Sequence, residues 1–144
     1  MRSLGLDIGA SRIGVAISDP LGLNASPLEV LSGLGTEELR SYVEEKRLEG
    51  VGRVVIGLPL TLRGKVGKQA RDAREYAKAI ASIADIEVVL WDERFSTVEA
   101  ERRLREAGRD PRRKRVDAEA AAVILQSYLE YAGTAAGKEK ENDV

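Results

Sequence analysis

Short apolar runs broken by glycine or proline open the chain, and such runs are typical of β-strands. Two of them, residues 3–8 and 13–18, are separated by a short loop containing Gly9, which favours an antiparallel hairpin. A third run, residues 27–31, is short enough for an edge strand, where Pro27 is tolerated. The beginning of the chain therefore predicts three strands with tight connections.

Helical patterns alternate with strand patterns from residue 36 onward. Thr36 is a preferred N-cap for the first helix, and Gly50 is a typical residue just after a helix end. The predicted elements are a helix between these two residues, a strand over 53–58, a helix over 68–84, a strand over 86–91, a helix from a capping box at 96–99 to Gly108, and a helix from Asp117 to Gly133.

Two of these helices have a recognisable inward face. The face of the second helix consists of small residues that allow close packing on a sheet, namely Ala70, Ala73, Ala77, Ile80, Ala81 and Ala84. The inward face of the last helix is formed by Ala121, Ile124, Leu125, Tyr128 and Leu129. Both helices are therefore expected to cover a sheet.

Three strands followed by alternating helices and strands predict an α/β fold with a mixed five-stranded sheet in the order 3-2-1-4-5. Helices are expected on both faces of this sheet. The element order is that of the ribonuclease H-like fold. Residues 1–133 are expected to form this single domain, and the small, polar tail over 134–144 is expected to fray.

The chain contains no cysteine and no histidine among its 144 residues. Disulfides, thiolate nucleophiles, the usual zinc sites and a Ser–His–Asp arrangement are therefore excluded. Acid–base or metal chemistry has to come from Asp, Glu, Lys or hydroxyl side chains. No apolar run approaches the roughly 20 residues that span a membrane, and no signal peptide precedes the first strand, so a cytoplasmic location and no membrane partner are expected.

Positive charge is concentrated in one segment, although the net charge of the chain is −1. Residues 102–115 hold eight basic and two acidic side chains, which gives this segment +6 and leaves −7 for the rest. A local patch of this kind can bind a polyanion even when the whole chain is nearly neutral. The alternative interpretation is a solvated loop, because runs of Arg and Lys often have no other role.

Three acidic residues stand at element ends where a carboxylate could act chemically. Asp7 ends the first strand, where α/β sheets open a crevice, although an Asp in this place also suits a turn. Glu93 follows the last strand; it is alternatively a solvated strand end paired with Arg94, and Asp92 is a plausible substitute. Asp117 begins the last helix, where Asp is also a preferred N-cap.

Together, these carboxylates match the site of nucleases that hold two divalent cations through Asp and Glu oxygens. One cation activates the attacking water, and the other stabilises the leaving oxygen. Such a site requires neither His nor Cys, in agreement with the composition. Mg²⁺ and Mn²⁺ are the ions that favour oxygen ligands of this kind.

Four sequence motifs resemble those of the YqgF/RuvX family of small nucleases. In chain order they are Asp7-Ile8-Gly9 with Arg12-Ile13-Gly14-Val15-Ala16-Ile17-Ser18-Asp19; Gly57-Leu58-Pro59-Leu60 with Gly64 and Gly67; Asp92-Glu93-Arg94-Phe95-Ser96-Thr97; and Asp117 with Ala120-Ala121 and Ile124-Leu125-Gln126. The resemblance extends from about residue 2 to residue 129, which is nearly the whole chain.

This resemblance implies a ribonuclease H-like nuclease that processes the 5′ end of precursor 16S rRNA in ribosome biogenesis or, alternatively, resolves Holliday junctions in branched DNA. It implies Asp7, Glu93 and Asp117 as the catalytic residues and as the ligands of Mg²⁺ or Mn²⁺. The expected nucleic-acid contacts are Arg12, Arg94, Arg112, Arg113, Lys114 and Arg115. A resolvase that cuts symmetrically would be a two-fold homodimer.

Two positions depart from the family pattern. Arg63 stands where the second motif usually has Asp, and Ser11 stands where the opening hairpin often has Lys. The loop after the fourth strand therefore contributes no acid, and Glu93 has to reach the site from the neighbouring strand.

Two other classes of function fit the same residues. Residues 7–11 also resemble the phosphate-binding hairpin of the actin and sugar-kinase superfamily, but those proteins clamp ATP between two such lobes and this chain has the length of one. A catalytically inactive RNA-binding or assembly module is the other alternative, because intact carboxylates do not prove turnover.

Overall fold

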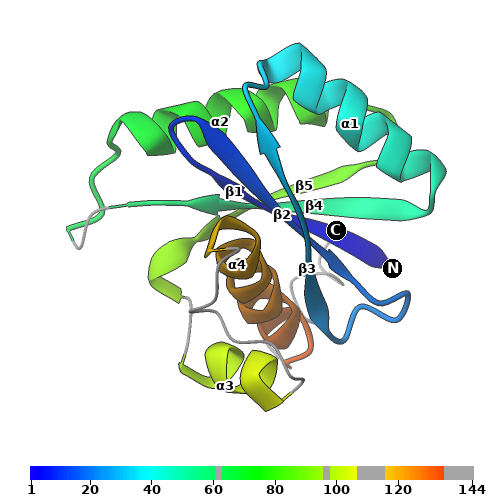
Figure 1. The fold of residues 1–144 in the computed structure, drawn as a ribbon, viewed down its shortest axis with the longest axis vertical. Helices are drawn as coiled ribbons and strands as arrows, with labels where there is room; N and C mark the ends of the chain where they lie inside the picture. The colour runs from blue at the N-terminus through cyan, green and yellow to red at the C-terminus, as the bar shows by residue number, and fades with distance from the viewer. Residues whose placement is uncertain (61–62, 96–97, 107–115, 135–144) are drawn as a thin grey trace.

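The computed structural model describes residues 1–60, 63–95, 98–106 and 116–134, and its centre is a mixed five-stranded sheet (Figure 1). The strands are β1 (Arg2–Ile8), β2 (Arg12–Ser18), β3 (Ala25–Ser32), β4 (Val51–Leu58) and β5 (Glu87–Asp92). They lie in the order β3-β2-β1-β4-β5, with β1 antiparallel to β2 and parallel to β4. The predicted sheet order is confirmed, and β1 is the central strand.

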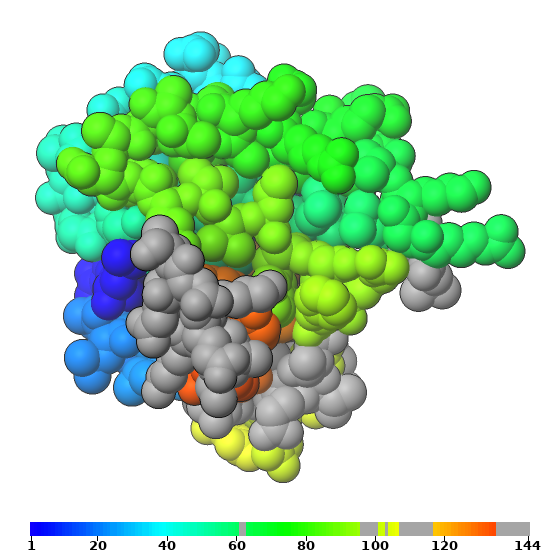
Figure 2. Space-filling model, turned by 180° about the vertical axis from the view of Figure 1, so that it is seen from behind, coloured from blue at the N-terminus to red at the C-terminus, as the bar shows by residue number. Residues whose placement is uncertain are grey.

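Helices cover both faces of the sheet, as predicted. α1 (Thr36–Leu48) and α2 (Lys68–Ala81) lie on one face, and α4 (Val116–Ala132) lies on the other (Figure 1). α3 (Val98–Glu106) packs on α4, and a 3-10 helix, η1 (Glu93–Phe95), follows β5 directly. Seen from behind, green side chains of the segment that leads from β4 into α2 project from the body (Figure 2). No helix in the described ranges is long and apolar enough to cross a membrane.

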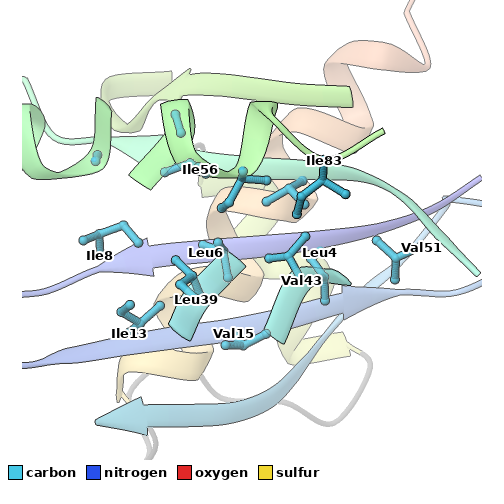
Figure 3. Close-up of a cluster of buried hydrophobic side chains, with 14 residues drawn as sticks. Leu4, Leu6, Ile8, Ile13, Val15, Leu39, Val43, Val51, Ile56 and Ile83 are labelled. Atoms are coloured by element: carbon cyan, nitrogen blue, oxygen red, sulfur yellow. The ribbon is translucent and has the colours of Figure 1, made fainter. Parts of the chain in front are cut away.

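Alternation along the strands divides the core into two layers. On β1, Leu4 and Leu6 point toward α1 and α2, where they pack with the other buried side chains drawn in Figure 3. The odd-numbered positions of the strand point toward α4, and a Cβ on Gly5 would lie 2.7 Å from Leu125 Cβ. Because Asp7 shares this direction, the strand pattern places its carboxyl on the α4 face of the sheet.

α4 and the opposite face of the sheet form the second layer. The predicted inward residues of α4 are all buried: Ala121, Ile124, Leu125, Tyr128 and Leu129. Small residues beneath the helix, including Gly5 and Ala16, let its backbone come close to the strands. Full burial of one large apolar side chain stabilises a fold by roughly 1.5–3 kcal/mol, so these contacts hold α4 firmly on the sheet.

Two helix boundaries differ from the predictions for local reasons. The N-cap of α1 is Gly35 and not Thr36, because the carboxylate of Glu38 accepts a hydrogen bond from the backbone N–H of Gly35. α2 ends at Ala81 and does not continue to residue 84, and both Ala81 and Ala84 of its predicted apolar face are exposed. The small-residue pattern was therefore right for the body of α2 and wrong at its end.

Other boundaries shift slightly or fall outside the described residues. β3 is longer than the predicted strand over 27–31, and α4 begins at Val116, one residue before Asp117. The predicted capping residues 96 and 97, the helix end at Gly108 and the tail from residue 135 onward lie outside the described ranges.

Candidate active site

Asp7 is half-buried near the end of the central strand, and its backbone pairs with that of Gly14 across the hairpin. Burial raises the pKa of Asp7, and the negative charge of Asp117 raises it further. A hydrogen bond with Glu93 acts in the opposite direction. The carboxyl at the centre of the sheet therefore resists ionisation unless positive charge is brought to it.

Glu93 begins η1 and reaches Asp7 across β4, the strand that lies between β5 and β1. Burial, followed by the negative charge of Asp7, raises the pKa of Glu93 to about 7. The hydrogen bond with Asp7 adds to this rise in the pKa of Glu93. Gly57 leaves room for the approach, because a Cβ there would lie 2.7 Å from Glu93 Oε1. Glu93 thus reaches the site from the neighbouring strand, as the sequence requires.

Asp117 lies in the first turn of α4, where the helix dipole favours a negative charge. Its charge acts on Asp7, and its Oδ2 lies 3.3 Å from Nε of Arg12, the first residue of β2. Gly14 permits this position of the helix, because a Cβ there would lie 1.9 Å from the carbonyl oxygen of Asp117. The structure thus places Glu93 against Asp7 and leaves Asp117 paired with Arg12 near them, and the role of these three acids as a site stays a prediction.

Asp92 and Arg94 form a separate pair beside these acids. Nη2 of Arg94 lies 2.6 Å from Asp92 Oδ2, and its Nε donates to both oxygens of the same carboxylate. The hydrogen bonds from Arg94 lower the pKa of Asp92. Asp92 is accordingly bound to Arg94, whereas Glu93 is bound to Asp7, and Glu93 as the active acid stays a prediction.

The described residues hold no group of three or more acidic side chains already arranged around a metal position. Glu93 and Asp7 are joined by their hydrogen bond, and Asp117 is turned toward Arg12. The donor set nevertheless fits a hard divalent cation, because it consists only of carboxylate oxygens. Burial and, after it, repulsion between carboxylates raise the pKa values of Asp7 and Glu93, and a bound cation would relieve that repulsion.

The predicted nucleic-acid contacts lie only partly within the described residues. The side chain of Arg12 is 64% exposed and pairs with Asp117, and Arg94 pairs with Asp92. The basic residues 112–115 lie outside the described ranges. Nucleic-acid binding by all of these residues stays a prediction.

Several residues that shape the site escaped the sequence-based interpretation. Gly14 and Gly57 belong to the quoted motifs, but only the structure shows that each leaves room for an acidic residue. The Ser127 hydroxyl accepts a hydrogen bond from Trp91 Nε1 at 3.1 Å and donates one to the Phe95 carbonyl at 2.7 Å, which ties η1 to α4. These roles depend on contacts between distant segments, for which one sequence offers no signal beyond the small size of the residue.

A mixed five-stranded sheet in this order, with helices on both faces, has the ribonuclease H-like fold. Solved structures share the fold. RuvC of T. thermophilus in complex with a Holliday junction substrate is 18% identical with a TM-score of 0.54, and the match covers 91% of this chain and 96% of that chain. The fowlpox virus resolvase in complex with Holliday junction DNA is 13% identical with a TM-score of 0.54, over 93% and 100% of the two chains.

Sequence comparison narrows the class to one family. The family model RuvX, described as Holliday junction resolvase, matches residues 1–131. A relative from Pelotomaculum thermopropionicum is 44% identical over 137 residues, covering 92% of this chain and 89% of its own, and one from Anaeromyxobacter sp. is 49% identical over 133 residues, covering 90% and 97%. Both carry the name "Putative pre-16S rRNA nuclease". The chain belongs to the RuvX family, which confirms the resemblance of its four motifs.

Proposed function

We propose that this chain is a nuclease that hydrolyses phosphodiester bonds at the site formed by Asp7, Glu93 and Asp117. The observation that carries the proposal is the placement of the acids: Asp7 pairs with Gly14, a Cβ on Gly14 would lie 1.9 Å from the Asp117 carbonyl oxygen, and a Cβ on Gly57 would lie 2.7 Å from Glu93 Oε1. Bringing acids together does not stabilise a fold, because like charges repel and burial disfavours the ionised form. Their convergence supports a chemical role, and the names of the curated relatives support the same class of reaction.

The proposal includes a divalent cation, Mg²⁺ or Mn²⁺, held by Asp7, Glu93 and Asp117. When bound, such an ion supplies Lewis acidity for activating water and for neutralising charge on the phosphate. To bind it, Asp7 and Glu93 would give up their shared proton, and Asp117 would exchange Arg12 for the ion.

The chain's own groups are suited to this exchange. Glu93, with a pKa of about 7, takes up or releases its proton near neutral pH. Arg12 is mostly exposed and can leave Asp117 for phosphate oxygens, which a guanidinium binds in a fixed geometry. The arrival of a phosphate at Arg12 would therefore release the Asp117 carboxylate for its role as a ligand.

Precursor 16S rRNA is the substrate we propose, on the basis of the names carried by relatives that are 44% and 49% identical over most of their length. Branched DNA is the alternative, because the family model is described as a Holliday junction resolvase. A ribosomal precursor would place the protein in the cytoplasm, whereas symmetric cleavage of a junction would require a two-fold homodimer.

Cleavage of the two substrates side by side tests the proposal. Labelled RNA with the 5′ precursor sequence of 16S rRNA and a labelled four-way DNA junction are incubated with the full chain and either Mg²⁺ or Mn²⁺. We expect ion-dependent cleavage of the RNA. Preferential cleavage of the junction would select the alternative substrate, and no cleavage of either by folded protein would contradict the nuclease proposal.

Replacement of Asp7 tests the site itself. Asp7→Asn keeps the size of the side chain but removes a charged ligand, so we expect cleavage to fall by at least about 100-fold, the scale of losing a group that acts in the transition state. Binding of the nucleic acid should persist. The matched control is Asp72→Asn on α2, where the acid pairs with Lys68 at the surface. Equal rates for both variants would place the active site elsewhere.

A further inference from the structure

Phe95 presents an exposed aromatic ring next to the candidate active site. It is the last residue of η1, and the residue is 54% exposed. Single exposed apolar side chains are common in proteins, so exposure alone indicates no function. The way in which this ring is held and its distance from Glu93 are what distinguish it.

The ring of Phe95 is supported from behind by other aromatic rings. Its centroid lies 5.5 Å from that of Trp91 in an edge-on arrangement, and Trp91 itself contacts Tyr128 and Tyr131 of α4 at 5.4 and 5.2 Å. The Ser127 hydroxyl fixes the backbone, because it donates to the carbonyl of Phe95 at 2.7 Å. Phe95 is thus the outermost member of an ordered aromatic cluster, and little further ordering is needed for it to bind a partner.

Phe95 is also close in the chain to Glu93 of the proposed active site. It follows Glu93 by two residues, so the Cα atoms of the two are at most about 7.6 Å apart, given about 3.8 Å between consecutive Cα atoms. Successive nucleotides of a stacked strand are separated by about 3.4 Å along its axis. A strand whose phosphate lies at the acidic site would therefore have a nearby base within reach of Phe95.

We propose that Phe95 is a base-stacking site for an unpaired base adjacent to the cleaved phosphodiester bond. This inference rests on the proposed nuclease function and adds a preference for single-stranded segments to it. Bases inside a duplex are already stacked on both sides, so only an unpaired base can offer a face to the ring. Because every base has such a face, the site discriminates little between bases and accepts RNA or DNA.

Binding measurements on single-stranded and double-stranded ligands test the stacking site. In an Asp7→Asn background, which prevents cleavage, fluorescence anisotropy of a labelled short single-stranded RNA and of a blunt duplex is measured. Phe95→Ala and Phe95→Leu should weaken binding of the single strand by about 5- to 150-fold, the range of one lost base stack, and Phe95→Tyr should retain it. Binding of the duplex should change little.

Leu90→Ala is the matched control, because Leu90 is 40% exposed on β5 and its side chain lies on the α1 and α2 face of the sheet. It should bind both ligands like the parent protein. Should Phe95→Ala prove unstable in thermal unfolding, the comparison of Phe95→Leu with Phe95→Tyr decides. Equal affinity of Phe95→Leu and Phe95→Tyr for the single strand, or an equal loss for both ligands in Phe95→Leu, would overturn the proposal.

Abasic substitutions locate the base that stacks. Removal of one base beside the cleaved bond should weaken binding to the parent protein but cost nothing further in Phe95→Leu, because the two changes remove the same contact. If removal of a base weakens binding to Phe95→Leu as much as binding to the parent protein at every position, the stacking site is overturned. Binding that depends on Phe95 without cleavage of any substrate would instead overturn the proposed nuclease function alone.

Trp91, the single tryptophan of the chain, gives a label-free signal, and its fluorescence should change when a base reaches Phe95.

Discussion

Glu93 and Asp7 share a hydrogen bond, and the pKa of each carboxyl is raised above its ordinary value. Burial supplies the largest part of the pKa rise at each of these residues, and neighbouring carboxylates supply the next part. At the scale of single residues, the raised pKa values favour a proton on the same carboxyls that would bind a cation. Protonation and binding of a divalent ion are therefore expected to compete.

The pH dependence of stability follows from the raised pKa of Glu93. Its pKa is about 7 in the folded protein, against an ordinary value of 4.5, so between these values the folded state holds more protons than the unfolded state. The free energy of unfolding of the metal-free protein should therefore be highest below about pH 4.5, as far as this group is concerned, and decrease as the pH rises to about 7. The raised pKa of Asp7 acts in the same direction.

Thermal unfolding in the presence of a chelator, followed across this pH interval, measures the effect. Glu93→Gln cannot ionise, so its melting temperature should decrease less between these pH values than that of the parent protein. Mg²⁺ should raise the melting temperature of the parent most at the upper end of the interval, because the ion binds the deprotonated carboxylates. Parallel profiles of melting temperature against pH for Glu93→Gln and the parent protein would contradict the raised pKa of Glu93.

Some of this chemistry was predictable from single residues and some was not. The alternation of Leu4, Leu6 and Ile8 fixes the face to which Asp7 points, and sequence pattern contains that information. The choice between Asp92 and Glu93 depends on Arg94, which binds Asp92, and on the space above Gly57. Neither contact follows from residue type, so the sequence left both acids as candidates, and Glu93 as the active acid stays a prediction.

At the scale of elements, close contacts between α4 and the sheet set the position of Asp117. Gly14 on β2 lies directly beneath the first turn of the helix, and Gly57 on β4 lies beneath Ile124 and Glu93. A side chain at either position would push α4 or Glu93 away from the strands. The same two glycines thus allow α4 to pack on the sheet and allow Asp117 and Glu93 to take their positions.

Substitution of Gly14 should damage stability and activity together. Its added Cβ would lie 1.9 Å from the Asp117 carbonyl oxygen, so Gly14→Ala has to displace the first turn of α4. Overpacking of this kind typically destabilises by about 1–3 kcal/mol, and the displaced Asp117 should reduce cleavage as well. Urea unfolding and the RNA cleavage assay measure the two effects. Gly67→Ala is the control, because a Cβ there meets nothing within 4 Å, and a Gly14→Ala variant as stable and active as this control would contradict the packing role.

At the scale of the whole molecule, the sheet order was predictable because short hairpins and helical crossovers leave few alternatives. The hairpin links order β3, β2 and β1, and the two parallel strands then have to add beyond β1. Exact helix ends were less predictable. The N-cap of α1 is Gly35, whose backbone N–H binds the Glu38 carboxylate, and two exposed alanines near the end of α2 made its apolar face look longer in the sequence than it is. Local pattern thus determined the architecture, whereas side-chain contacts determined the boundaries.

Charge is unevenly distributed over the whole molecule. Residues 102–115 carry +6 in a chain whose net charge is −1. If this segment holds the phosphate backbone, simultaneous replacement of Arg112, Arg113 and Arg115 by Ala should weaken binding and reduce the dependence of log Kd on log salt. Three lost contacts to a single strand should lower the slope by about 2, at about 0.7 per phosphate. Binding titrations over a range of salt concentrations measure it. Replacement of Lys68, Arg71 and Arg74 on α2 removes the same charge elsewhere, so an equal change of slope in both triple variants would show that net charge, and not this segment, governs binding.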